Sequence, residues 1–133
     1  MAACKILIID DDEDDIDILT EAFTQCGVDG VHHVSTAMQA FMYLQQLERD
    51  SLPRLIVTNH YLPGITGAEF LQDLKGMDKY KHIHVMVLSS AKSPKDIERY
   101  RQLGAIDYLV KPSSYEEYVD VAANIKARLH QAG

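Results

Sequence analysis

The sequence of 133 residues has no tryptophan, only two cysteines and no long apolar run. Even its longest unbroken apolar stretches, such as Ile6–Ile9, are very short, so no segment is long enough to cross a bilayer as a helix. Acidic residues come directly after that stretch, which is unlike a secretory signal. Cys4 and Cys26 lack the spacing of metal ligands and are interpreted as reduced, buried thiols. We therefore expect a cytoplasmic protein with no membrane partner.

An excess of basic residues is also absent. Lys and Arg number 13 against 20 Asp and Glu, which gives a formal net charge of −7. No basic stripe along the sequence offsets this charge, so nucleic acid is not expected as a partner. Hydrophobic residues make up 47% and charged residues 25% of the chain, as in globular proteins, which excludes a disordered chain. The length suits one domain, expected over residues 1–133.

Short apolar runs alternate with segments of helical periodicity. Five runs are predicted to be strands, at residues 5–9, 31–34, 55–58, 85–88 and 106–110, and the first of them is typical of a buried strand. Helix starts are predicted at hydroxyl residues that can cap them, namely Thr36 or Ser35, Thr66, Ser93 and a residue near Ser114. Five strands alternating with five helices predict a doubly wound α/β sandwich of three layers, because right-handed crossovers cover both faces of a parallel sheet.

Polar side chains follow four of the predicted strands where each strand ends. They are Asp10, Asp11 and Asp12 after the first strand, Thr58, Asn59 and His60 at the third, Ser89 and Ser90 at the fourth, and Lys111 and Pro112 after the fifth. Because the carboxyl ends of parallel strands meet at one edge of the sheet, we expect these groups to converge. Carboxylate and amide oxygens suit a divalent hard cation, and a hydroxyl with an ammonium suits a phosphoryl group.

Two other motifs match part of this pattern. Asp10, Asp12, Asp14 and Glu21 imitate a calcium-binding EF-hand loop, but Asp15 stands where a glycine is needed. A strand followed by Asp10 and Asp12, with a serine and a lysine at later strand ends, also resembles haloacid-dehalogenase-type phosphatases, in which Asp10 would be the nucleophile and Asp12 the acid. That family has Thr or Val where Asp14 stands and needs a further acidic strand end. Despite these two departures, a phosphatase is kept as an alternative because the other residues match.

The full set resembles the receiver domain of bacterial two-component response regulators, from Lys5 to the region of Leu129. The motifs that carry the resemblance are Asp10-Asp11, LPGITG at 62–67, Ser89-Ser90-Ala91, Gly104-Ala105 and YLVKP at 108–112. Thirty residues separate positions 59 and 89, and 22 separate positions 89 and 111, as in that family. The resemblance implies a flavodoxin-like five-stranded parallel sheet in the order 2-1-3-4-5 with five helices.

The resemblance also implies roles for residues at the strand ends. Asp10, Asp11 and the backbone carbonyl of Tyr61 would hold Mg²⁺. Ser89 would donate a hydrogen bond to a phosphoryl oxygen, and Lys111 would pair with the phosphoryl charge.

Two further expectations come from the same resemblance. Ser89 and Tyr108 would form the switch that responds when the site is filled. The Lys111–Pro112 peptide is expected to be cis, which a tertiary amide tolerates.

One residue departs from the family pattern. The phosphoacceptor aspartate of the family falls at position 59, where this sequence has Asn59. A carboxamide is a far poorer nucleophile than a carboxylate, so the chain is not expected to form an acyl phosphate. The lost negative charge predicts weak Mg²⁺ binding, and the Asn59 oxygen is expected to accept from Lys111 or to bind the metal. Whether Asn59 is the natural residue or an introduced change is left open.

We therefore expect a receiver module of a phosphorelay that is not an enzyme. Its expected partners are a sensor histidine kinase or phosphotransfer protein and a downstream protein target. No DNA-binding or catalytic segment is expected after Leu129, so output is expected through protein contacts. A phosphatase and a constitutive docking protein are the alternatives, and the kinase, the target and the oligomeric state are left open.

Overall fold

Five parallel strands form one sheet in the computed structural model, which describes residues 4–132. They are β1 (Ile6–Ile9), β2 (Val31–Val34), β3 (Leu55–Thr58), β4 (His84–Ser89) and β5 (Asp107–Val110). The order β2-β1-β3-β4-β5 confirms the predicted flavodoxin-like topology. The expected domain, residues 1–133, extends beyond the described residues at both ends.

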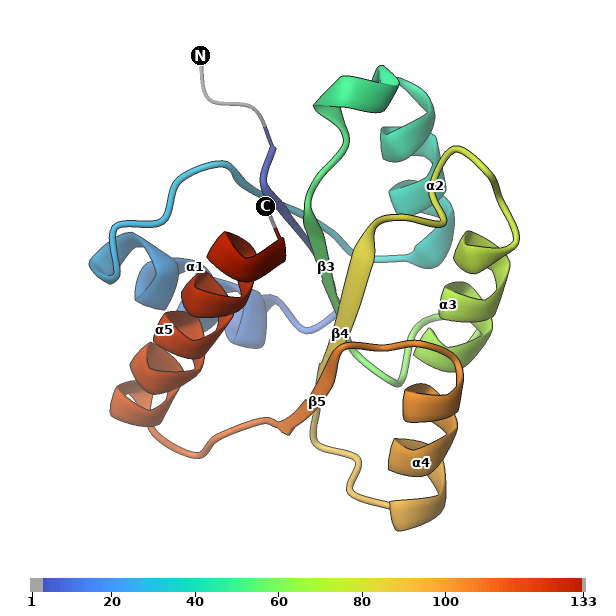
Figure 1. Cartoon of the computed structure of the whole chain (residues 1–133). Helices are drawn as coiled ribbons and strands as arrows, with labels where there is room; N and C mark the ends of the chain where they lie inside the picture. Colours follow the sequence, from blue (N-terminus) through green and yellow to red (C-terminus); the bar gives the residue numbers. More distant parts are fainter. Residues whose placement is uncertain (1–3, 133) are drawn as a thin grey trace.

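Helices cover both faces of the sheet (Figure 1). They are α1 (Glu13–Gln25), α2 (Ala37–Gln45), α3 (Gly67–Lys75), α4 (Pro94–Gln102) and α5 (Tyr115–Ala132). Helices α1 and α5 lie side by side on one face, and α2, α3 and α4 lie on the other. A short 3₁₀ helix, η1 (Arg49–Ser51), precedes β3 and was not predicted. None of the described helices is long and apolar enough to span a membrane.

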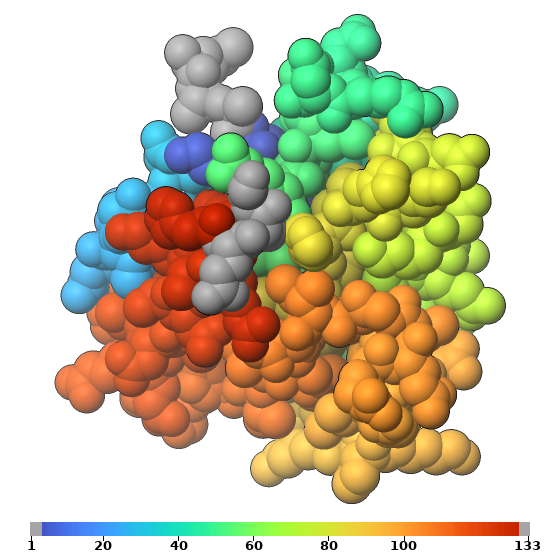
Figure 2. All heavy atoms as spheres, in the orientation of Figure 1, coloured from blue at the N-terminus to red at the C-terminus, as the bar shows by residue number. Residues whose placement is uncertain are grey.

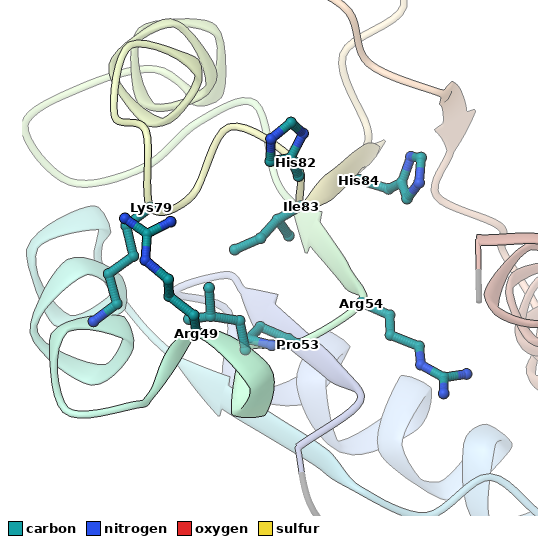
Figure 3. Close-up of a pocket in the computed structure, with 8 residues that line it drawn as sticks. Arg49, Pro53, Arg54, Lys79, His82, Ile83 and His84 are labelled. Atoms are coloured by element: carbon teal, nitrogen blue, oxygen red, sulfur yellow. The ribbon is translucent and has the colours of Figure 1, made fainter.

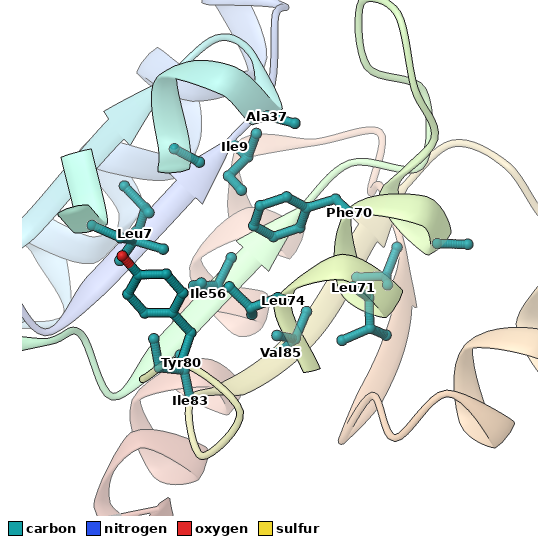
Figure 4. Packing of buried hydrophobic residues seen from close by; sticks show 14 of the residues in the cluster. Leu7, Ile9, Ala37, Ile56, Phe70, Leu71, Leu74, Tyr80, Ile83 and Val85 are labelled. Carbon is teal, nitrogen blue, oxygen red and sulfur yellow. The ribbon is translucent and has the colours of Figure 1, made fainter. Parts of the chain in front are cut away.

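The central strands β1, β3 and β4 are buried on both faces, which explains why they appear in the sequence as apolar runs, whereas the edge strands β2 and β5 are partly exposed. Alternate residues of β1 enter different cores: Leu7 and Ile9 pack towards α2 and α3, whereas Ile6 and Ile8 pack towards α1 and α5. Figure 4 shows the first of these cores, in which Phe70 and neighbouring apolar side chains of α3 pack against the sheet. The sheet is thereby fixed between the two helical layers, and its strand ends have little freedom to move.

Local signals set most helix starts. The Thr36 hydroxyl accepts a hydrogen bond from the Gln39 amide, and Thr66 forms a reciprocal capping box with Glu69, as predicted. Ser93 makes no side-chain cap, and α4 instead begins with a proline in its first turn.

The two cysteines are less buried than expected. Cys4 and Cys26 are free, as expected, but half-buried rather than buried.

The last third of the chain forms one face of the molecule. In the space-filling view, the chain from α4 through β5 to α5, coloured orange to red, forms a continuous face in the lower half of the molecule (Figure 2).

Candidate functional site

The polar residues at the four strand ends lie together, as the strand pattern predicts. Asp10 Oδ1 is 3.4 Å from the side-chain nitrogen of Asn59, and Asp10 Oδ2 is 2.8 Å from Lys111 Nζ. The backbone amide of Lys111 donates to the carbonyl of Ser89 over 2.9 Å. Asp10, Asn59 and Ser89 are all buried, although each is polar. Buried polar groups are stable only with hydrogen-bond partners, so the contacts of each group define this site.

The amide of Asn59 has one orientation that satisfies its neighbours. Its oxygen accepts a hydrogen bond of 2.9 Å from the backbone N–H of His60. Its nitrogen donates to the carbonyl oxygen of Tyr61 over 3.0 Å and points towards Asp10. Because only the amide oxygen can accept from an N–H, the reversed orientation would lose these bonds. The Asn59 oxygen therefore faces the backbone, and the expected hydrogen bond from Lys111 is not formed.

Lys111 instead bridges two carboxylates. Its ammonium lies 2.8 Å from Asp10 Oδ2 and 2.6 Å from Asp15 Oδ2. Asp15 belongs to the first turn of α1, and its other oxygen lies 3.4 Å from the Tyr118 hydroxyl. Sequence reasoning missed Asp15 because an acid in the first turn of a helix is usually a dipole or capping residue. Asp12 is the N-cap of α1 and accepts from the Asp15 amide, so its carboxylate is engaged in capping.

Burial and neighbouring charges have opposite effects on the pKa values of Asp10 and Lys111. Burial raises the pKa of Asp10 above its ordinary value, while the Lys111 ammonium and the Asp12 amide act against that rise. Burial alone would lower the pKa of Lys111, but hydrogen bonds and charge from Asp10 and Asp15 together raise it. The ammonium is therefore held charged between two carboxylates.

The two predicted switch residues hold the same loop residue. The amide of Ala91 donates to Ser89 Oγ over 3.2 Å, and the Tyr108 hydroxyl donates to the Ala91 carbonyl over 2.6 Å. Tyr108 is half-buried, between the site and the surface. The loop that follows β4 is thereby tied to both β4 and β5.

His60 connects the site to α4. Its ring is buried, and Nδ1 lies 2.7 Å from the Tyr100 hydroxyl. A Cβ added at Gly67 would lie 2.5 Å from the Asn59 carbonyl oxygen and 2.7 Å from the Tyr100 hydroxyl. Gly67 thus allows α3 to approach both the site loop and α4, a close contact that the LPGITG motif did not itself reveal.

The predicted cis peptide is wrong. No cis peptide bond occurs among residues 4–132, so Lys111–Pro112 is trans. The tertiary amide makes both isomers accessible but leaves trans lower in energy, by about 0.5–1 kcal/mol.

The predicted metal ligands suit Mg²⁺ in their donor atoms but not in the arrangement of those atoms. Asp10, Asp11 and the Tyr61 carbonyl supply oxygens, the donors that Mg²⁺ prefers. Within the described part of the chain, no three His, Cys, Asp or Glu side chains are grouped closely enough to hold a metal. The Asn59 nitrogen already donates to the Tyr61 carbonyl and points at Asp10. Binding of Mg²⁺ through these oxygens therefore has to displace the Asn59 amide.

Comparison with known proteins gives one consistent result. Residues 6–123 match the family described as "Response regulator receiver domain". Over 112 residues the chain is 32% identical to the "Two-component response regulator ORR12" of Oryza sativa subsp. japonica, covering 84% of this chain and 89% of that protein. It is 28% identical to ORR1 of the same subspecies over 113 residues, or 81% of this chain, but spans only 49% of ORR1.

A solved structure agrees over nearly the whole chain. The phosphorylated cyanobacterial phytochrome response regulator RcpA superposes with a TM-score of 0.84 at 27% sequence identity, covering 99% of this chain and 97% of that chain. The similarity extends over all five strands, including the four whose ends carry the site.

Proposed function

The chain belongs to the response regulator receiver family of two-component systems, and from this membership we propose that it signals by binding alone, without forming an acyl phosphate at residue 59. Receiver domains are generally signalling modules rather than classical enzymes. The observation that supports the proposal is Asn59, whose amide occupies the end of β3 and is hydrogen-bonded on both sides. A neutral carboxamide lacks the anionic oxygen that attacks a phosphoryl donor.

The neighbouring side chains still suit reversible binding of a phosphate-like group. Lys111 would supply the positive charge, and Ser89 a hydroxyl at the end of β4. Asp10, Asp11 and the Tyr61 carbonyl would hold Mg²⁺, which when bound neutralises charge on a phosphoryl group. In this chain the Asn59 amide and the Lys111 ammonium already meet the acceptors of Asp10. Lys111 thus offsets one of the two carboxylate charges that it bridges, and the neutral Asn59 amide adds none.

Output would pass through the face made by α4, β5 and α5. Tyr108 joins this face to the loop after β4, and His60 joins the site to Tyr100 of α4. Tyr100 and Tyr118 are buried and serve as packing, whereas Val110 and Tyr115 are exposed. Exposed apolar groups beside polar ones suit a protein interface. A sensor histidine kinase or phosphotransfer protein and a downstream protein are the proposed partners.

The test is to restore the carboxylate. The Asn59→Asp variant is incubated with Mg²⁺ and acetyl phosphate and analysed by intact mass, beside the parent chain. We expect one added phosphoryl group on Asn59→Asp, labile to hydroxylamine as an acyl phosphate is, and none on the parent. Asn124→Asp is the matched control, because it makes the same chemical change on an exposed surface of α5.

Two outcomes would contradict the proposal. A phosphoryl group on the parent chain would show that Asn59 is not the limiting residue. An unlabelled Asn59→Asp variant would show that position 59 is not the acceptor position. Hydrolysis of a generic phosphate ester by the parent, abolished by Asp10→Asn, would favour the phosphatase alternative instead.

A further inference from the structure

A basic hollow lies at the edge of the sheet opposite the acidic site. It encloses about 310 Å³ between η1, the start of β3 and the segment before β4. Its polar lining consists of Arg49, Arg54, Lys79, His82 and His84, with no carboxylate (Figure 3). The register of β3 and β4 pairs Leu55 with His84, which brings two basic segments together from distant parts of the sequence.

The charge in this basic hollow is unbalanced. The chain as a whole carries a formal charge of −7, yet three Lys and Arg side chains gather here. Arg49, Arg54 and Lys79 form no ion pair with any residue between 4 and 132, whereas nearby Lys81 pairs with Asp78. Like charges placed together without a counter-ion repel one another, so the hollow favours an anion.

The side chains divide into two groups. In Figure 3, the Arg49 and Lys79 side chains lie beside each other on one side of the hollow with their charged ends pointing in opposite directions, and His82 lies above Ile83. Arg54 and His84 point towards the other side. Arg49 and Lys79 are therefore the two Lys and Arg side chains on the same side of the hollow.

The floor of the hollow is apolar. Pro53 and Ile83 are buried there, beside the half-buried Leu52. A hollow of about 310 Å³ falls at the lower end of the size range for small-molecule sites. An arginine fork and a lysine bind phosphate oxygens strongly, and an apolar floor can support a planar ring.

We propose that this basic hollow binds a nucleoside di- or triphosphate, with its phosphates on Arg49 and Lys79 and its nucleoside on the floor formed by Pro53 and Ile83. The two cations neutralise the phosphate charge that the rest of this acidic protein repels. The site is separate from the strand ends that carry Asn59, so it does not depend on the function proposed for them.

The test is titration of the parent chain with ATP by calorimetry, in buffer with EDTA so that no metal–nucleotide complex reaches the acidic site. We expect saturable binding that weakens as salt is added. Replacing two charge-assisted contacts in the double variant Arg49→Gln/Lys79→Gln is expected to weaken binding by about tenfold or more. Arg99→Gln is the matched control, since Arg99 is an exposed arginine of α4, outside the lining of the hollow.

Further ligands test each part of the proposal. Tripolyphosphate is expected to bind more weakly than ATP, and adenosine not to bind. Absence of saturable ATP binding by the parent, or equal affinity in Arg49→Gln/Lys79→Gln, overturns the proposal. Tripolyphosphate binding as tightly as ATP overturns the role of the apolar floor. A single-stranded oligonucleotide that binds more tightly than ATP overturns the assignment to a small ligand.

Discussion

The side-chain nitrogen of Asn59 donates a hydrogen bond of 3.0 Å to the backbone carbonyl oxygen of Tyr61. An aspartate at position 59, which we propose is the phosphoacceptor position of the family, would have no hydrogen to donate there. The Tyr61 carbonyl would then face a second acceptor, and a cation would be needed between them. The amide thus replaces part of what a metal supplies, and this contact leads directly to a difference in metal affinity.

We predict that Asn59→Asp binds Mg²⁺ at least about tenfold more tightly than the parent, because ligand charge sets the affinity of hard cations for carboxylate sites. Calorimetric titration with MgCl₂ measures both proteins, and Asn124→Asp controls for a change in overall charge. Asp11→Ala is expected to abolish the weak binding of the parent. If the parent and Asn59→Asp bind Mg²⁺ equally, the assignment of Asp10, Asp11 and Tyr61 as ligands is wrong.

Lys111 is expected to contribute strongly to stability. Replacement by Met leaves the buried Asp10 carboxylate without its ion pair, and breaking a buried pair in this way costs about 3 kcal/mol of unfolding free energy. Urea denaturation followed by circular dichroism measures the loss. Lys95→Met, on the exposed surface of α4, is the control and is expected to change little. A similar loss in the two variants would show that the ion pair has no special weight.

The sequence predicted the strand ends and their convergence because burial on both faces leaves a clear pattern of continuous apolar residues. Asp10 and Asn59 follow such runs, Lys111 follows a partly exposed edge strand, and parallel topology brings all three to one edge. The threonine caps were also predictable, because their partners lie only three residues away. These features depend on local spacing, which a sequence displays directly.

Other features depend on contacts between distant segments. The bridge from Asp15 to Lys111 spans 96 positions, and the basic hollow joins the region of η1 to the segment before β4. The sequence contains no basic stripe, and it showed no sign of this hollow because the basic residues of the hollow come from separate segments. The orientation of the Asn59 amide likewise follows from its neighbours in space, which no local pattern shows.

Gly67→Ala is predicted to destabilise the protein by about 1–3 kcal/mol, since the new methyl group would overlap the Asn59 carbonyl oxygen and the Tyr100 hydroxyl, and overpacking carries this cost. Gly76→Ala is the matched control. A Cβ at Gly76 comes no closer than 3.4 Å to another atom, and its backbone is right-handed helical. That variant is expected to be neutral or slightly stabilising. Thermal unfolding compares the two, and equal melting temperatures would contradict the close packing at Gly67.

The last prediction concerns alkaline pH. Tyr118 is 4% exposed, and burial, aided by the charge of Asp15, raises its pKa to about 12. In the unfolded chain a tyrosine titrates near its ordinary pKa of about 10, so between these two values the unfolded state loses the proton first. Stability from this group is complete below the lower value and is lost as pH rises through the higher one.

Tyr118→Phe removes that titration, so its unfolding free energy should fall less steeply between pH 9 and pH 11.5 than that of the parent, with both pH values chosen to bracket most of the window. Burial also raises the pKa of Tyr43 and Tyr100, so the variant is expected to remove a part of the slope and not all of it. Urea unfolding at the two pH values gives the slope for each protein. Tyr61→Phe is the control for removal of a tyrosine hydroxyl at an exposed position, because Tyr61 is 61% exposed. Parallel slopes for the parent and Tyr118→Phe would contradict this prediction, because they would show that burial against α1 does not raise the pKa of Tyr118.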